Sequence, residues 1–302
     1  MDEQASYLAL VQDELSRRAE VLAGWVSPCR LCRRACGAHR DRGETGFCGI
    51  GATVRVASYG PHFGEEPELV GRYGSGTIFF SGCNLACVYC QNSEISWGRQ
   101  GWEIGADALA GVMLALQDSG CHNINLVTPT HVASGIVDAL LIARDGGLRL
   151  PLVWNCGGYE SVDVLRQLDG IVDIYMPDLK YGTNDAACRL SDAPDYVAVS
   201  REAVREMHRQ VGDLVVADGV AVRGLLLRHL VLPERLAASR EVLRFVAEEI
   251  SRDSYVNIMA QYRPMHRAEE FPELARRVHA EEVAEVLADA HRRGLHRGFP
   301  EA

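Results

Sequence analysis

Residues 81–92, SGCNLACVYCQN, place three cysteines, Cys83, Cys87 and Cys90, in the spacing C-x3-C-x2-C. They directly follow residues 76–80, GTIFF, a short apolar run rich in β-branched and aromatic side chains that predicts a buried strand. Three thiolates on a tight loop can bind three irons of a [4Fe–4S] cluster, whose usual complement is four cysteines. The stretch therefore predicts a cluster with one iron open to a ligand that is not protein.

Two other interpretations of these cysteines fit their spacing less well. A structural zinc site requires four closed ligands, which usually come as two separated pairs. Three cysteines within eight residues cannot all pair as disulfides, and we expect an intracellular chain, in which disulfides are rare. The spacing and the preceding strand together favour the open cluster.

Composition and charge narrow the class of protein. The chain has 302 residues, 47% hydrophobic and 24% charged, which is typical of a globular protein. Its N-terminus lacks the features of a signal peptide and no apolar stretch approaches the length of a membrane span, so we expect a cytoplasmic protein. The net charge of −10 gives no general attraction for nucleic acid or an anionic membrane, and neither is an expected partner.

Ten cysteines in such a chain indicate metal or redox chemistry rather than disulfides. Besides the three above, four lie within twenty residues, at Cys29, Cys32, Cys36 and Cys48. Too few apolar residues occur there to fold the segment by burial alone, so the four thiolates predict a compact metal knuckle. Structural zinc and an auxiliary [4Fe–4S] cluster both accept four thiolates, and the sequence leaves the metal open. The remaining three, Cys121, Cys156 and Cys188, are expected to be small buried residues.

From Gly76 onward, predicted strands and helices alternate, which indicates a parallel sheet. The expected strands are 76–80, 123–128, 151–155, 171–176, 224–231 and 255–259. The expected helices are 106–118, 133–144, 161–168, 196–211, 239–250 and 273–293. About six such units predict an α/β fold, a closed or partly closed TIM-like (β/α)6 barrel. An amphipathic helix over 4–23, with Val11 on its apolar face, and a half-exposed strand over 52–59 are expected before it.

Polar residues follow the predicted strands at their carboxyl ends, where barrels of this kind carry their chemistry. The cluster cysteines follow the first strand, residues 128–131 (TPTH) the second, residues 155–158 (NCGG) the third, and Asp178 with Lys180 the fourth. Lys180 is the only lysine among 31 basic residues, which indicates a position where arginine will not serve.

These motifs resemble the radical S-adenosylmethionine (SAM) superfamily, and specifically proteins related to pyruvate formate-lyase activating enzyme. The resemblance rests on residues 82–92, on DIYMPDLK at 173–180 and on the stretch 228–233, and its motif order covers about residues 76–265. The knuckle, HFGEEP at 62–67 and NLVTPTH at 125–131 are similar to a subgroup without an assigned substrate. The resemblance implies that SAM binds the open iron through its methionine amino and carboxylate groups. One electron from the cluster then cleaves the sulfonium to a 5′-deoxyadenosyl radical, which abstracts hydrogen from a substrate.

The resemblance also implies which residues surround SAM. Cys83, Cys87 and Cys90 would ligate the cluster, and Tyr89 would lie near the adenine. Where the family has a Gly-Gly-Glu segment, this chain has Thr128-Pro129-Thr130, so hydroxyls and carbonyls are expected to receive the SAM ammonium. Asn155, Gly157 and Gly158 are expected near the ribose. Asp178 and Lys180 are expected near the SAM carboxylate or the substrate. His131 is the remaining candidate, as a catalyst. A structural ion pair is the alternative for Asp178 and Lys180, and a satisfied polar residue is the alternative for His131 and His229.

Three functions are compatible with these features. The first is an activating enzyme that abstracts hydrogen from a backbone glycine of a large partner, and the second is a radical SAM enzyme acting directly on a small molecule or peptide. The third, a non-catalytic iron–sulfur sensor or scaffold, makes little use of an open cluster. An electron donor such as flavodoxin or ferredoxin is the expected partner. We expect three segments: an N-terminal helix and knuckle (1–75), the barrel (76–265) and a C-terminal helix packed on it (266–302).

Overall fold

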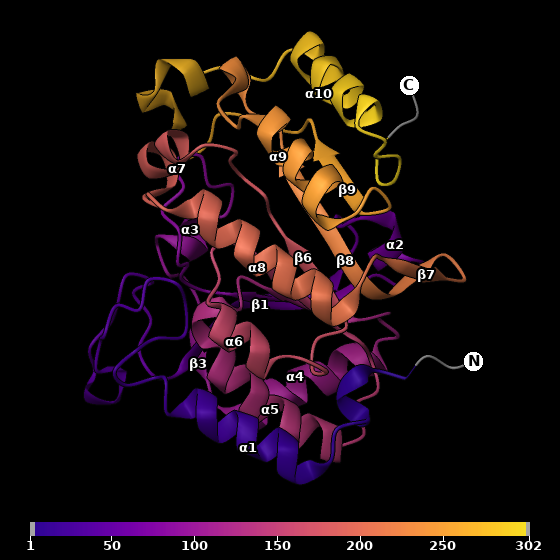
Figure 1. Ribbon diagram of the computed structural model, residues 1–302. Helices are drawn as coiled ribbons and strands as arrows, with labels where there is room; N and C mark the ends of the chain where they lie inside the picture. Colours follow the sequence, from indigo (N-terminus) through magenta and orange to yellow (C-terminus); the bar gives the residue numbers. More distant parts are fainter. Residues whose placement is uncertain (1–3, 300–302) are drawn as a thin grey trace.

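The computed structural model describes residues 4–299 (Figure 1). Residues 1–3 and 300–302, at the two ends of the predicted outer segments, lie outside the described residues. Its centre is a sheet in which six strands run parallel in the order β2-β4-β5-β6-β8-β9. These strands are β2 Ser75–Phe80, β4 Ile124–Val127, β5 Leu152–Cys156, β6 Ile174–Pro177, β8 Val220–Leu230 and β9 Tyr255–Met259. The parallel ladder with helices between its strands confirms the predicted partial TIM-like barrel.

Antiparallel strands extend this sheet at two places. β1 (Val54–His62) pairs with β2, and β3 (Trp102–Ile104) pairs with β1. β7 (Val215–Ala217) forms a hairpin with the start of β8 and projects from the body of the molecule (Figure 1). The strand expected over 52–59 is thus β1, whereas β3 and the β7–β8 hairpin were not predicted.

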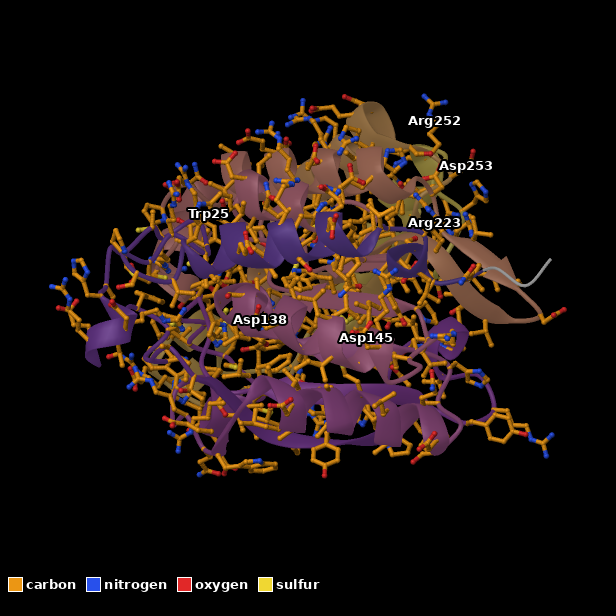
Figure 2. The ribbon with its side chains drawn as sticks, turned by 90° about the horizontal axis from the view of Figure 1, so that it is seen from below. Trp25, Asp138, Asp145, Arg223, Arg252 and Asp253 are labelled. Carbon is orange, nitrogen blue, oxygen red and sulfur yellow. The ribbon has the colours of Figure 1, made fainter. Side chains whose placement is uncertain are left out.

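The predicted helices are all present, although two of them begin later than expected from the sequence. They are α4 Ala106–Asp118, α5 Ala133–Asp145, α6 Val162–Gln167, α8 Tyr196–Val211, α9 Ser239–Phe245 with a π turn to Ile250, and α10 Ala280–Arg292. Helix α1 (Gln12–Ala23) packs on α5, and Figure 2 shows Asp138 and Asp145 of α5 beside it. Three short helices were not predicted: α2 Pro67–Val70, α3 Ser93–Ser96 and α7 Asn184–Ser191.

Two predicted helices are too long at their N-terminal ends. The segment before α1 is held out of the helix because Asp173 Oδ1 accepts the backbone N–H of Ser6 at 2.7 Å, and residues 6–8 form a 3-10 turn. Val11 is consequently exposed rather than part of the apolar face. The last helix begins at Ala280, where the carboxylate of Glu282 accepts the backbone N–H of His279 at 2.8 Å in a capping box.

The parallel register decides which side chains face the helices. Ile78, Leu126, Trp154, Tyr175 and Leu225 lie side by side across five strands, and each is at most 1% exposed. They belong to the main core between the sheet and its helices. Since successive strand residues point to opposite faces, the neighbouring row, which includes Val127 and Asn155, faces the inside of the barrel.

Among the described residues, we find no helix with the length and apolar character required to cross a membrane.

Gly224 provides a test of this packing. Its φ of +122° is unusual for any residue with a side chain, and a Cβ there would lie 2.4 Å from the carbonyl oxygen of Asp213. We expect Gly224→Ala to lower the free energy of unfolding by about 1–3 kcal/mol because backbone, not a flexible side chain, would have to move. The control is Gly111→Ala in α4, where a Cβ meets nothing within 4 Å and helix propensity predicts a gain of up to about 1 kcal/mol. Urea unfolding of both variants measures the difference, and equal effects would contradict the packing.

Candidate functional site

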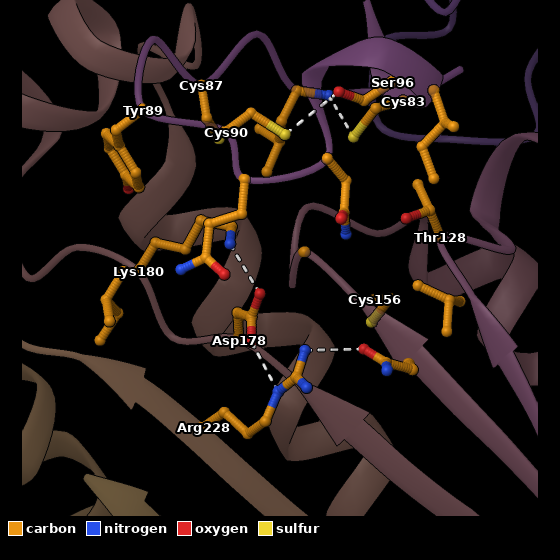
Figure 3. Close-up of a pocket in the computed structure, with 18 of the residues that line it drawn as sticks. Cys83, Cys87, Tyr89, Cys90, Ser96, Thr128, Cys156, Asp178, Lys180 and Arg228 are labelled. Carbon is orange, nitrogen blue, oxygen red and sulfur yellow. Dashed lines mark hydrogen bonds and ion pairs between the residues drawn. The ribbon is translucent and has the colours of Figure 1, made fainter. Parts of the chain in front are cut away.

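A cavity of about 240 Å³ opens at the carboxyl ends of the parallel strands (Figure 3). The cluster loop after β2, the ends of β4, β5 and β6, and the later part of β8 line it. The fold brings most of the predicted site together in this cavity. Its lining includes all three cluster cysteines together with Tyr89, Thr128, Asn155, Gly157, Asp178 and Lys180.

The cluster loop begins at Gly82, whose φ of +83° turns the chain out of β2. Each cysteine after it lies near a hydrogen-bonding group. The backbone N–H of Leu85 donates to Cys83 Sγ at 3.4 Å, and the Ser191 hydroxyl donates to Cys87 Sγ at 3.0 Å. Cys90 Sγ lies 3.1 Å from Ser96 Oγ. Burial raises the pKa of Cys83 and of Cys87 in the metal-free form. A metal would therefore have to displace protons from these thiols, and the donors would stabilise the resulting thiolates.

These thiols suit a cluster better than a single ion. Within residues 4–299, no three His, Cys, Asp or Glu side chains gather so that they could hold one metal ion. A [4Fe–4S] cluster does not require such convergence, because each thiolate binds a different iron. Three cysteines on one loop, all facing one cavity, are a donor set that fits the cluster.

A partly buried ion cluster forms the floor of the cavity. Lys180 Nζ lies 2.6 Å from one carboxylate oxygen of Asp178, and Arg228 Nε lies 2.8 Å from the other (Figure 3). Burial alone would raise the pKa of Asp178, but the two cations hold it below its usual value. Burial alone would lower the pKa of Lys180, and Asp178 more than reverses that effect. All three groups are therefore charged at neutral pH.

Arg228 connects this cluster to two further polar groups. Its guanidinium donates to Asn155 Oδ1 at 2.7 Å and lies 3.3 Å from Glu65 Oε2. Glu65 comes from the loop after β1, and it accepts a hydrogen bond from the Asn125 side chain at 3.2 Å. The Asn155 side chain is thus fixed by Arg228.

Thr128 adopts a strained backbone conformation at the cavity wall. Its φ is +58°, which is rare for a β-branched residue, and its N–H donates to the carbonyl of Asn155 at 2.8 Å. Strain of this kind is concentrated at functional sites, where the surrounding structure holds it in place. Thr128 belongs to the cavity lining.

Thr130 and His131 are not among the lining residues, although Thr130 was expected to contact SAM and His131 to act as a catalyst. Thr130 is 1% exposed and its hydroxyl donates to Glu160 Oε1 at 2.7 Å. His131 Nε2 lies 2.7 Å from the carbonyl oxygen of Ser81, and burial lowers its pKa to about 4, so it is neutral. Both residues support the loops around the cavity rather than its surface. His229 is satisfied at both ring nitrogens, by the Leu179 carbonyl and the Ser239 hydroxyl, whereas Nδ1 of His131 has no hydrogen-bond partner within residues 4–299.

The remaining predicted residues lie as follows. The Tyr89 hydroxyl donates to that of Tyr181 at 2.7 Å, with both rings buried. Gly157 lines the cavity, and a Cβ there would lie 2.7 Å from Leu85 Cδ1. Gly158 lies behind it at φ +76°, where a Cβ would lie 2.5 Å from the carbonyl oxygen of Asp178.

Several lining residues were not identified as site residues from the sequence. Arg228 stands in an otherwise apolar strand, LLLRHLV, and a charge in such a run is the signal that could have identified it. Cys156 is buried, as expected, and it also lines the cavity. Cys188 is exposed, so its expected burial is wrong.

The comparisons with known proteins agree with this site. A family model described as the radical SAM superfamily matches residues 77–231. An uncharacterized protein of Methanocaldococcus jannaschii is 30% identical over 291 residues, which is 93% of this chain and 79% of that protein.

Two solved structures are similar at lower identity. One is a radical SAM methyltransferase from Sphaerobacter thermophilus, with 15% identity, a TM-score of 0.47 and coverage of 72% of this chain and 64% of that one. The other, described as native anSMEcpe with bound AdoMet, has 11% identity, a TM-score of 0.48 and coverage of 70% and 57%. This chain spans less than two thirds of either structure's length.

The chain belongs to the radical SAM superfamily. Membership implies a [4Fe–4S] cluster and SAM, and the three cysteines of the cluster loop are a donor set that fits the cluster.

Because the charges of the ion cluster compensate one another, we expect one substitution in it to lower the stability of the protein strongly. Arg228→Met would leave Asp178 and Glu65 buried with less compensating charge, so we expect the free energy of unfolding to fall by about 3–5 kcal/mol. The matched control is Arg166→Met, which removes an exposed ion pair with Asp163 and should cost less than about 1 kcal/mol. Chemical denaturation compares the two. A loss at Arg228 no larger than that at Arg166 would show that the buried charges do not depend on one another.

Proposed function

We propose that this protein reductively cleaves SAM and uses the resulting radical to abstract hydrogen from a substrate bound at the mouth of the barrel. The observation that carries the proposal is the cavity itself, in which three cysteines of one loop face an ion cluster and a strained threonine. When bound, the cluster and SAM together supply a one-electron cleavage of the sulfonium that gives methionine and a 5′-deoxyadenosyl radical.

The ion cluster gives the methionine carboxylate a place to bind. Lys180, Arg228 and Asp178 line the cavity, and Arg228 is also paired with Glu65, which lies outside the lining. Lys180 is therefore the cation with fewer carboxylate partners. Asp178 is paired on both oxygens, so it positions Lys180 rather than acting as a base. We assign Lys180 Nζ, the end of the only lysine side chain, to the carboxylate of SAM.

The opposite end of the methionine group carries an ammonium. Thr128 offers a hydroxyl in the cavity wall, and its strained backbone fixes the direction of that group. We propose that Thr128 receives the ammonium, together with backbone carbonyls of its loop. Tyr89 and Gly157 line the remaining part of the cavity, and we assign them to the adenine and the ribose.

Other parts of the function stay proposals from the sequence. We propose that Cys29, Cys32, Cys36 and Cys48 bind a second metal centre, and that a flavodoxin or ferredoxin supplies the electron. Activation of a glycyl-radical enzyme and direct action on a small molecule or peptide both remain predictions, as does a cytoplasmic location.

Anaerobic reconstitution with iron and sulfide, followed by dithionite and SAM, tests the proposal through the release of 5′-deoxyadenosine. We expect product from the wild type and none from a Cys83/Cys87/Cys90→Ala triple variant, because that variant has no ligands for the cluster. The matched control is Cys188→Ala, which removes an exposed cysteine on α7 and should keep wild-type activity.

The interpretation depends on cluster loading, so iron content and the EPR spectrum are measured on the same samples. If the cleavage requires the true substrate, SAM should still change the EPR spectrum of the reduced cluster. A loaded cluster whose spectrum is indifferent to SAM would refute the proposal.

A further inference from the structure

The N-terminal cysteine knuckle, residues 29–48, buries thiols in a segment with little regular structure. It appears as irregular loops at the left of Figure 1 and contains the 3-10 turn Arg40–Arg42. Cys29, Cys32 and Cys48 are nevertheless only 6–8% exposed. Something other than a sheet or helix has to hold this segment in place, and cross-linking through the thiols is one means of doing so.

The local backbone supports thiolates at two of these positions. The backbone N–H of Leu31 lies close to the sulfur of Cys29, and that of Arg34 lies close to the sulfur of Cys32. The N–H two residues later also faces the sulfur at Cys83 in the cluster loop. This pattern alone is not specific to metal ligands, since Cys156 shows it too. The pattern indicates metal ligands here because it occurs within a group of four cysteines.

A buried positive charge provides the independent observation. Arg40 is 3% exposed, and its guanidinium donates to the carbonyls of Ile50 and His131 and lies 3.8 Å from Cys29 Sγ. Within the described part of the chain, it makes no ion pair with a carboxylate. A buried guanidinium requires a compensating negative charge, and a metal-bound thiolate at Cys29 would supply it.

The knuckle is built directly onto the cluster loop. A Cβ on Gly82 would lie 2.8 Å from the carbonyl oxygen of Cys48, so the backbones of these two residues meet without space for a methyl group. Arg34 donates to the carbonyl of Asn84 at 2.9 Å, which ties the knuckle to the loop between Cys83 and Cys87. The two cysteine groups are therefore in direct backbone contact.

The opposite side of the knuckle faces solvent. Cys36 is exposed, as are Arg30, Arg33 and Arg42. Residues 29–48 carry five arginines against two carboxylates, although the whole chain has a net charge of −10. The knuckle thus presents a local positive charge to any acidic protein that approaches Cys36.

We propose that Cys29, Cys32, Cys36 and Cys48 bind a redox-active iron–sulfur cluster that passes electrons to the radical SAM cluster. The inference rests on the proposed SAM chemistry and assigns the knuckle a part in it. A reduced one-electron carrier protein with an acidic surface, of the iron–sulfur or flavin class, loses one electron and the knuckle cluster gains it. That cluster then loses the same electron to the cluster held by Cys83, Cys87 and Cys90, so no other reactant is needed.

Metal analysis of the anaerobically purified full-length chain is the first test. We expect about eight irons per chain and no stoichiometric zinc, because two four-iron clusters would be present. The Cys29→Ser/Cys32→Ser double variant and the Cys83→Ser/Cys87→Ser double variant should each retain about four. One zinc with four irons in the wild type would overturn the relay.

Low-temperature EPR of the unmodified, fully reduced protein requires no variant and stays informative if the double variant unfolds. Two reduced clusters in contacting loops should show spin–spin broadening and faster relaxation than the isolated [4Fe–4S] cluster of a single-cluster ferredoxin. Two independent signals would contradict the contact between the loops.

Reduction by flavodoxin tests the direction of electron flow. Stopped-flow mixing with reduced flavodoxin should reduce the SAM-responsive cluster at least about tenfold more slowly in the Cys29→Ser/Cys32→Ser variant. Dithionite, a small reductant, should reduce it at similar rates in both proteins, which controls for damage to the cluster itself. Equal rates with flavodoxin would overturn the relay.

Failure of the relay differs from failure of the SAM chemistry. A loop cluster that responds to SAM beside a zinc-filled knuckle refutes only the relay. A loop cluster that is fully loaded yet indifferent to SAM refutes the proposed function on which the relay rests.

Discussion

The site depends on mutual compensation among buried charges. Asp178 directly follows β6 and Arg228 lies on β8, and the two residues also form an isolated parallel bridge. Each would be costly to bury alone, whereas together with Lys180 they form a satisfied floor beneath the cavity. Because Arg228 also binds Asn155 and Glu65, the same compensation fixes a cavity residue on β5 and the loop after β1.

The loop of cysteines above this floor is constrained from its other side. Gly82 turns the chain at a φ that favours glycine, and it does so against the backbone of Cys48 in the knuckle. His131, which is neutral and buried, binds the carbonyl of Ser81 and so supports the residue before the turn. The cluster loop is thus held between the barrel mouth and the knuckle, a rigid setting that a preorganised site requires.

Sequence patterns were sufficient for the barrel because its strands are buried on both faces and read as short apolar runs. They also located the cluster loop, since cysteine spacing is a local property. Arg228 was missed because its role depends on Asp178, fifty residues earlier in the chain, which only the closed sheet brings beside it. Thr130 and His131 illustrate the converse, because both follow β4 in sequence but turn away from the cavity to bind Glu160 and Ser81. The length of α1 was overestimated because the backbone N–H of Ser6 donates to the carboxylate of Asp173. This tertiary contact overrides the helical periodicity of the sequence.

The central claim is that the loop of three cysteines leaves an iron to which SAM binds directly. Pulsed EPR of the reduced protein with SAM labelled with ¹⁵N at its amino group measures this most directly. We expect a resolved coupling between the cluster spin and the labelled nitrogen, which disappears when SAM is omitted. A fully reduced and loaded cluster without such coupling, in the presence of bound SAM, would contradict it.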